Sequence, residues 1–135
     1  MTIEEFLEAR IAENEAIARA ALRHPTKYNR ETRDHERAGT DDGVWHIDSY
    51  TDPDDECTVV GAAMTIYDEG GHTAEQATHI ARHDPARVLR QCAALRRVLE
   101  FGATLVSASQ QVEFENDVLL PVAAIWPEHP DYPAE

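Results

Sequence analysis

The chain has 135 residues, of which 42% are hydrophobic, and a formal net charge of -14. This length suits one domain with its own core, and the composition is too apolar for a disordered chain. No apolar run approaches the roughly 20 residues of a membrane span, and the acidic start "MTIEE" lacks the form of a signal peptide. We therefore expect a single cytoplasmic domain over residues 1–135 that makes no contact with membranes.

The charges are unevenly distributed along the chain. All twelve basic residues, eleven arginines and one lysine, lie between 10 and 37 or between 82 and 97. The blocks 38–81 and 98–135 hold ten and seven acidic residues and no basic one. Because such a surface repels phosphates, direct binding of nucleic acid is not expected. A basic surface on a partner protein suits it better, whereas acidity that only keeps the protein soluble is the alternative.

The first predicted element is a helix over residues 2–23. Thr2 and Glu5 have the spacing of a capping box, and Pro25 follows the end of the helix. Its apolar residues recur at helical spacing: Ile3, Phe6, Leu7, Ile11, Ile17, Ala18, Ala21 and Leu22. Residues 26–43 have no periodic apolar face and are predicted as a solvated loop, with at most a short helical turn at 30–37.

Two segments rich in β-branched and aromatic residues, 44–50 and 57–67, are predicted as strands. The stretch "TDPDDE" between them has the composition of a turn, and "DEGG" at 68–71 ends the second strand. The sequence therefore predicts a small antiparallel hairpin that packs on helices. Trp45 and Trp126 are expected to anchor a core or a groove, or to mark a protein contact where exposed.

The second half of the chain is predicted to be mainly helical. A helix begins at Thr73, which can form a capping box with Gln76, and runs to about residue 83. The Asp84-Pro85 step begins another helix, since aspartate is a favoured N-cap and proline a favoured first residue. Gly102 is the expected C-cap of that helix.

The remaining segments complete the expected fold class, which is α+β. Residues 103–111 fit a helix or a loop, 115–126 favour a buried helix over a strand, and the proline-rich 127–135 is predicted as an extended tail. The helical bundle then consists of the N-terminal helix, the helix broken at Asp84-Pro85 and the C-terminal helix, beside the small hairpin. Cys57 and Cys92 lie in apolar surroundings outside any C-x-x-C pair, which favours buried thiols over a disulfide.

Two stretches, "HIARHDPARVLR" at 79–90 and "HPDY" at 129–132, resemble a family of small uncharacterised proteins from actinobacteria and their phages. Further shared features are "RIAENEAIA" at 10–18 and Trp45 after a glycine-containing loop. The resemblance covers most of the chain. It implies this source and the architecture given above, and it implies no activity.

The two histidines of the first stretch are the candidate metal ligands. His79 and His83 are four residues apart, so they share a helix face and can both reach one zinc ion. Ile80 stands where the zinc-protease pattern needs a glutamate, which excludes that class. Four residues are candidates for a third ligand: His72, Asp84, His129 and Asp131. The alternative is structural, because a cation is favoured in the last turn of a helix and Asp84 caps the next one.

Two further groups have both a chemical and a structural interpretation. His129 and Asp131 are two residues apart, so in an extended segment they point the same way and form a candidate acid–base pair. The alternative is a turn that packs Tyr132 on the body of the protein. The arginines between 82 and 97 can form an anion-binding face, although the seventeen acids of the arginine-free blocks favour neutralisation within the chain.

The charge blocks and the lack of a catalytic constellation favour a non-enzymatic accessory or regulatory protein that binds a protein partner. An inhibitor or a DNA mimic is a special case. This hypothesis needs no cofactor, and its candidate binding residues are Trp45, His79, His83, Asp84, His129, Asp131 and Tyr132. The alternative is a metal-dependent enzyme or a metal-binding module that holds Zn on His79 and His83.

Overall fold

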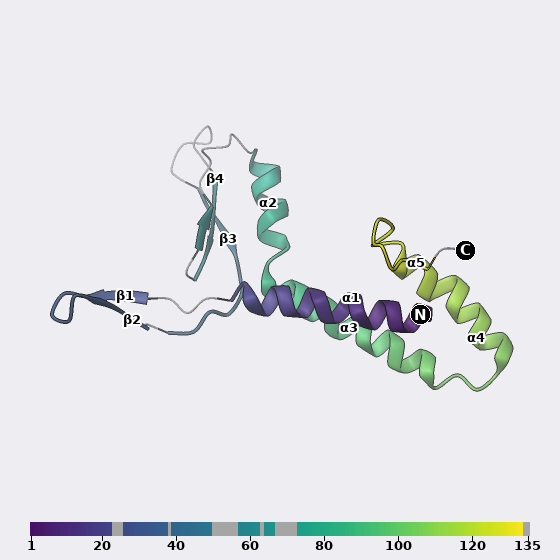
Figure 1. Ribbon diagram of the computed structural model, residues 1–135. Helices are drawn as coiled ribbons and strands as arrows, with labels where there is room; N and C mark the ends of the chain where they lie inside the picture. Colours follow the sequence, from purple (N-terminus) through teal and green to yellow (C-terminus); the bar gives the residue numbers. More distant parts are fainter. Residues whose placement is uncertain (23–25, 38, 50–56, 63, 67–72, 134–135) are drawn as a thin grey trace. The chain divides into compact units, whose positions relative to one another are not determined.

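The computed structural model describes residues 1–22, 26–37, 39–49, 57–62, 64–66 and 73–133. Helices and small antiparallel sheets make the fold α+β, as predicted (Figure 1). The chain divides into unit 1, Met1–Ala16 with Arg90–Glu135, and unit 2, Ile17–Leu89. None of the described helices combines the length and the apolar character needed to cross a bilayer. Three predicted features lie outside the described residues: Pro25, the turn at 51–56 and the strand end at 68–71.

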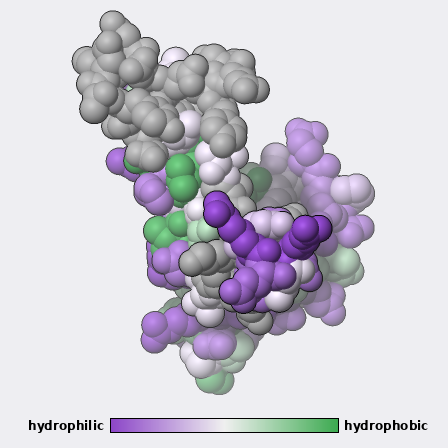
Figure 2. Space-filling view, turned by 90° about the vertical axis from the view of Figure 1, so that its left-hand side faces the viewer, coloured by the Kyte–Doolittle hydropathy of each residue, from purple (hydrophilic) through white to green (hydrophobic). Residues whose placement is uncertain are grey.

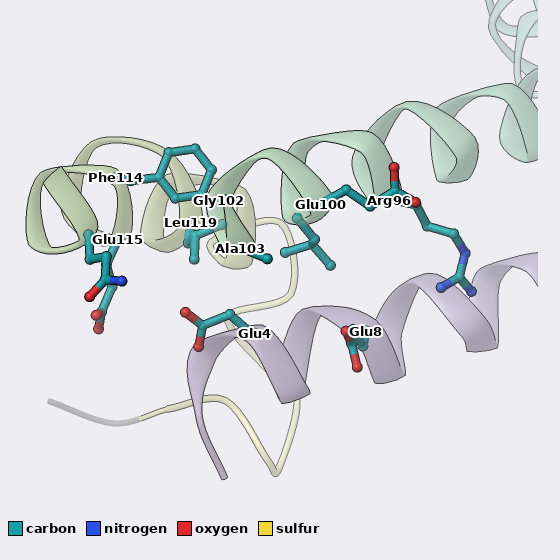
Figure 3. Close-up of a pocket in the computed structure, with 11 residues that line it drawn as sticks. Glu4, Glu8, Arg96, Glu100, Gly102, Ala103, Phe114, Glu115 and Leu119 are labelled. Atoms are coloured by element: carbon teal, nitrogen blue, oxygen red, sulfur yellow. The ribbon is translucent and has the colours of Figure 1, made fainter. Parts of the chain in front are cut away.

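Unit 1 is built from helices. The helix α1 (Ile3–Ala20) begins in this unit and α3 (Pro85–Ala103) ends in it, and the two run side by side in Figures 1 and 3. A continuous helical run follows, made of α4 (Ala108–Phe114), η2 (Glu115–Leu119) and α5 (Leu120–Ala123). The predicted capping box of α1 is confirmed, because the Glu5 amide donates to the Thr2 hydroxyl at 3.2 Å and the Thr2 amide donates to the Glu5 carboxylate at 2.8 Å.

The core of unit 1 lies between the start of α1 and the end of the α4–α5 run. Its buried members are Ile3, Phe6, Leu7, Leu119 and Ala123. The apolar face predicted for residues 2–23 is confirmed at five buried positions, whereas Ile17 of that face is 62% exposed; the buried positions are Ile3, Phe6, Leu7, Ile11 and Ala18. The C-terminal residues fold back onto this core, since the ring of Tyr132 meets the ring of Phe6 edge-on at 5.7 Å. The prediction of an extended tail is therefore wrong for the described residues 127–133, which form turns.

A wide turn interrupts the last helical run. The amide of Leu120 donates to the carbonyl of Glu115, five residues back, which defines the π-helical segment η2. Pro121 follows directly, and it has no amide hydrogen and crowds the carbonyl four residues before it. A π turn relieves that crowding. The helix predicted over 115–126 thus forms as far as Ala123, and one side of it is buried as predicted: Leu119 and Ala123 are buried, and Leu120 and Val122 are half-buried against the same core.

Gly102 has a different role from the one predicted. It lies inside α3, which continues to Ala103, so the prediction of a C-cap is wrong. A Cβ atom at Gly102 would overlap the ring of Phe114. The glycine therefore makes room for an aromatic ring from α4. The ambiguous segment 103–111 becomes a short connection followed by the start of α4.

Unit 2 contains a hairpin that the sequence analysis did not predict. The strands β1 (Thr26–Asn29) and β2 (Asp34–Arg37) pair antiparallel, with Thr26 opposite Arg37. The prediction of a loop over 26–43 is wrong at these eight residues. Residues 30–36 between and along the strands are exposed, and hydrophilic side chains cover the hairpin where it faces the viewer in Figure 2. Since the described side chains at 28 and 30–36 are exposed, the periodicity that identifies a half-buried strand is missing there.

The second sheet has three antiparallel strands, β3 (His46–Ser49), β4 (Cys57–Gly61) and β5 (Met64–Ile66). The segment 57–67 was expected to form one strand, but it turns back after Gly61 and pairs with itself. The helix α2 (Ala74–Arg82) packs against β3 and β4 and begins with the predicted capping box of Thr73 and Gln76. Val59, Ala77 and Ala81 form the buried core, and Trp45 packs against it.

Candidate functional site

A groove of about 650 Å³ lies in unit 1 (Figure 3). Its floor contains Leu99, Phe114 and Leu119, which are buried or half-buried. Four exposed glutamates form its rim: Glu4, Glu8, Glu100 and Glu115. In Figure 3, the first two project from α1, Glu100 comes from α3 and Glu115 follows α4. We call this feature the acidic groove.

Arg96 is the one basic residue among those that line the acidic groove. Its guanidinium donates to both carboxylate oxygens of Glu15, from Nε at 3.0 Å and from Nη2 at 2.8 Å. These hydrogen bonds raise the pKa of Arg96 above its ordinary value, against a smaller opposing effect of burial. Because Glu15 already balances the charge of Arg96, the four glutamates leave the rim of the groove negative.

This groove is not predicted from the sequence. Glu4 and Glu8 are four residues apart in a predicted helix, so the sequence does place both on one helix face. Their approach to Glu100 and Glu115 depends on the packing of three helical segments, which local spacing does not reveal.

Asp84 and Trp45, two of the predicted site residues, are joined in unit 2. Oδ1 of Asp84 accepts from the amide of Arg87 at 2.7 Å, which confirms the predicted helix cap. Oδ2 accepts from the amide of Trp45 at 3.2 Å, and the Asp84 side chain is buried. The Asp-Pro step therefore does more than restart a helix, because its carboxylate also fixes the backbone that leads into β3.

Gly43 brings that backbone close to α3. Its carbonyl accepts from the amide of Ala86 at 3.0 Å, and its φ of 73° favours glycine. A Cβ atom here would lie 2.8 Å from a methyl carbon of Leu22 and 3.0 Å from the amide nitrogen of Ala86. The close approach of the loop to the first turn of α3 thus depends on this glycine.

His79 of α2 and His83, the C-cap of that helix, lie against each other, with ring centroids 4.3 Å apart and ring planes inclined by 37°. Nδ1 of His83 lies 2.7 Å from the carbonyl oxygen of His79, to which it donates. That contact leaves Nε2 as the ring nitrogen of His83 with a free lone pair. Within the ranges that the structure describes, no three His, Cys, Asp or Glu side chains are grouped to hold a metal ion. His72, a candidate third ligand, lies outside those ranges.

His129, Asp131 and Tyr132 come together in unit 1 as a turn, in which the Tyr132 amide donates to the His129 carbonyl at 2.9 Å. Arg10 donates to Nε2 of His129, and Nδ1 lies 3.9 Å from the Asp131 carboxylate. The rings of His129 and Tyr132 both contact Phe6. Because Arg10 holds the ring nitrogen that points away from Asp131, this geometry favours packing over acid–base chemistry.

The structure therefore groups the predicted site residues in three places. Trp45 lies with Asp84 and His79 with His83 in unit 2, while the residues of "HPDY" lie together in unit 1. Cys92 is buried, as expected, whereas the side chain of Cys57 lies outside the described residues.

The resemblance found in the sequence has a counterpart among known protein families. A family model described as a family of unknown function, DUF6221, matches residues 1–135. No curated protein and no solved structure matches the chain. Because the match extends over the full length, both units are part of what the family shares. The chain belongs to the DUF6221 family, whose function is unknown.

Proposed function

We propose that this protein is a non-enzymatic accessory or regulatory protein that binds a partner protein in the acidic groove of unit 1. One observation carries the proposal: an apolar floor and a rim of four glutamates occur in the same hollow. The preferred partner is an amphipathic helical segment whose apolar side chains enter the groove and whose lysines or arginines face the rim. Charged rims around apolar centres are the usual anatomy of protein interfaces.

The chemistry of the groove distinguishes this partner from others. Apolar floor residues such as Leu99 and Phe114 gain from contact with apolar side chains, since burial removes both surfaces from water. The glutamates speed the approach of a basic segment and reject an acidic one. The apolar floor supports an inhibitor that grips a segment of its target over a DNA mimic, for which rows of carboxylates suffice. We place this activity in the cytoplasm of an actinobacterium, with the protein encoded by the host or by a phage.

A pair of synthetic peptides tests the proposal. One is an amphipathic helix of leucine and lysine, and the other has glutamate in place of each lysine. We expect the lysine peptide to bind with a dissociation constant that rises with salt, and the glutamate peptide not to bind. Fluorescence anisotropy of the labelled peptides measures both affinities.

Two matched variants locate the binding site. The groove variant carries E4Q, E8Q, E100Q and E115Q. The control variant also removes four carboxylates, at exposed positions that do not line the groove: E31Q, E113Q, D117N and E128Q. We expect the groove variant to bind about tenfold more weakly, because several exposed charge pairs of a few tenths of a kcal/mol each are lost. Equal weakening by both variants would mean that net charge, and not the groove, attracts the peptide.

A further inference from the structure

A second hollow, of about 490 Å³, lies in unit 2 where α2 ends and α3 begins. Its basic residues are His79 and Arg82 of α2, His83 directly after that helix, and Arg87 of α3. The other residues that line it are Ala74, Glu75 and Thr78. We call this feature the basic hollow. It contains part of the "HIARHDPARVLR" stretch whose function the acidic groove does not explain.

The charge of the basic hollow is opposite to that of the chain as a whole. Two arginines and one carboxylate residue, Glu75, line the hollow, although the chain carries a net charge of -14. Among the described residues, neither Arg82 nor Arg87 has a carboxylate partner within ion-pair distance, whereas Arg10 and Arg96 each have one. The neutralisation expected from the acids of the arginine-free blocks is therefore not seen at the hollow, and the partner of Arg96, Glu15, also lies outside those blocks.

The composition of the hollow favours an anion over a metal cation. A guanidinium stays protonated and cannot ligate a metal, and two of them repel a divalent cation that approaches the imidazoles. The same groups form paired hydrogen bonds with the oxygens of a phosphate. The hydrogen bond from His83 to the His79 carbonyl further reduces the nitrogens available to a metal. We propose that the basic hollow binds a small oxyanion that carries two or more negative charges, of the phosphate or pyrophosphate type.

Calorimetric titration of the full chain with inorganic pyrophosphate tests the proposal. We expect one binding site for pyrophosphate, because the paired hydrogen bonds of the two guanidinium groups fit a single oxyanion. The variant R82Q/R87Q should lose at least about tenfold in affinity. The control R90Q/R97Q removes two exposed arginines of α3 that do not line the hollow, and it should bind as the unchanged protein does.

Two further measurements decide between the remaining outcomes. The variant R82K/R87K keeps both charges, so it should retain binding and thereby separate loss of charge from loss of fold. Titration with Zn²⁺ tests the metal alternative directly. Absence of pyrophosphate binding overturns the proposal, as does binding that R82Q/R87Q leaves unchanged. Stoichiometric Zn²⁺ binding that depends on His79 and His83, without pyrophosphate binding, overturns it in favour of a metal site.

Discussion

Units 1 and 2 are stabilised in different ways. The core of unit 1 contains large side chains, and Phe6 and Leu7 are buried almost completely. The core of unit 2 contains the smaller Val59, Ala77 and Ala81, and its loops are fixed by backbone contacts such as those to Asp84. Burial of apolar volume therefore contributes most in unit 1, whereas caps and anchored loops contribute most in unit 2. Each unit should respond to a different kind of substitution.

The hollows of the two units differ as clearly as their cores. The acidic groove has an apolar floor and four carboxylates, while the basic hollow has two arginines, two histidines and one carboxylate. The net charge of -14 predicts a negative site such as the acidic groove, but it does not predict a positive site such as the basic hollow. The sign of the charge at a site depends on the residues that line it. Salt screens charges that are farther away than about 8 Å at physiological ionic strength.

Of the substitutions that distinguish the two units, Phe6→Ala should lower the stability of the protein most, and it acts on unit 1. The ring of Phe6 is 0% exposed and contacts the rings of His129 and Tyr132. Its removal leaves a cavity and should lower the free energy of unfolding by about 3–5 kcal/mol. The variant V112A, which truncates a side chain of unit 1 that is 57% exposed, should change stability by less than about 0.5 kcal/mol.

The two tryptophans allow each unit to be followed separately. Trp126 packs against the core of unit 1 and Trp45 against that of unit 2. Denaturant unfolding is measured by fluorescence in W45F and W126F backgrounds, each with and without Phe6→Ala. A shift seen through both tryptophans supports the single domain predicted from the sequence, because coincident transitions indicate one cooperative unit. A shift seen through Trp126 alone contradicts it.

Asp84→Ala should cause the next largest loss of stability, and it acts on unit 2. The substitution removes the cap of α3 and leaves the amide of Trp45 without its acceptor. The two losses together should lower stability by about 2–3 kcal/mol. Asp84→Asn keeps one oxygen acceptor and should lower it by about half as much. Amide hydrogen exchange at Trp45 and Arg87 gives the local readout, and unchanged protection at Trp45 in the alanine variant would contradict the anchoring role.

The features that the sequence predicted are those that depend on neighbouring residues. The pairs Thr2 with Glu5 and Thr73 with Gln76 form capping boxes, and Asp84 caps α3, because each contact spans three residues. The missed features need distant or irregular contacts. Gly102 resembles a helix C-cap because the residues around it in the sequence do not indicate that Phe114 packs against it. The acidic groove was missed because its glutamates come from separate helical segments.

The β1–β2 hairpin was missed for another reason, which is the absence of a buried face. Its strands are polar, and its turn depends on Asn29, whose side-chain oxygen accepts from the amide of Glu31 at 2.9 Å and whose side-chain nitrogen donates to Glu36 at 2.8 Å. Such contacts give no alternation of apolar and polar residues. The predicted hairpin at 44–67 was recognised because its strands do contain buried Val59 and half-buried Ile47.

The ion pair between Glu15 and Arg96 should give the smallest effect, although its two hydrogen bonds have good geometry. The Arg96 side chain is 41% exposed, so water and salt weaken the attraction. A double-mutant cycle with E15Q and R96Q should give a coupling free energy of about 0.2–1 kcal/mol, lower at high salt. The raised pKa of Arg96 means that its stabilisation is complete below the ordinary arginine value and is lost only as the pH rises through the raised one. The coupling should therefore stay constant from about pH 6 to pH 10, and a decline within that interval would show that Arg96 is not the proton-binding partner inferred from the structure.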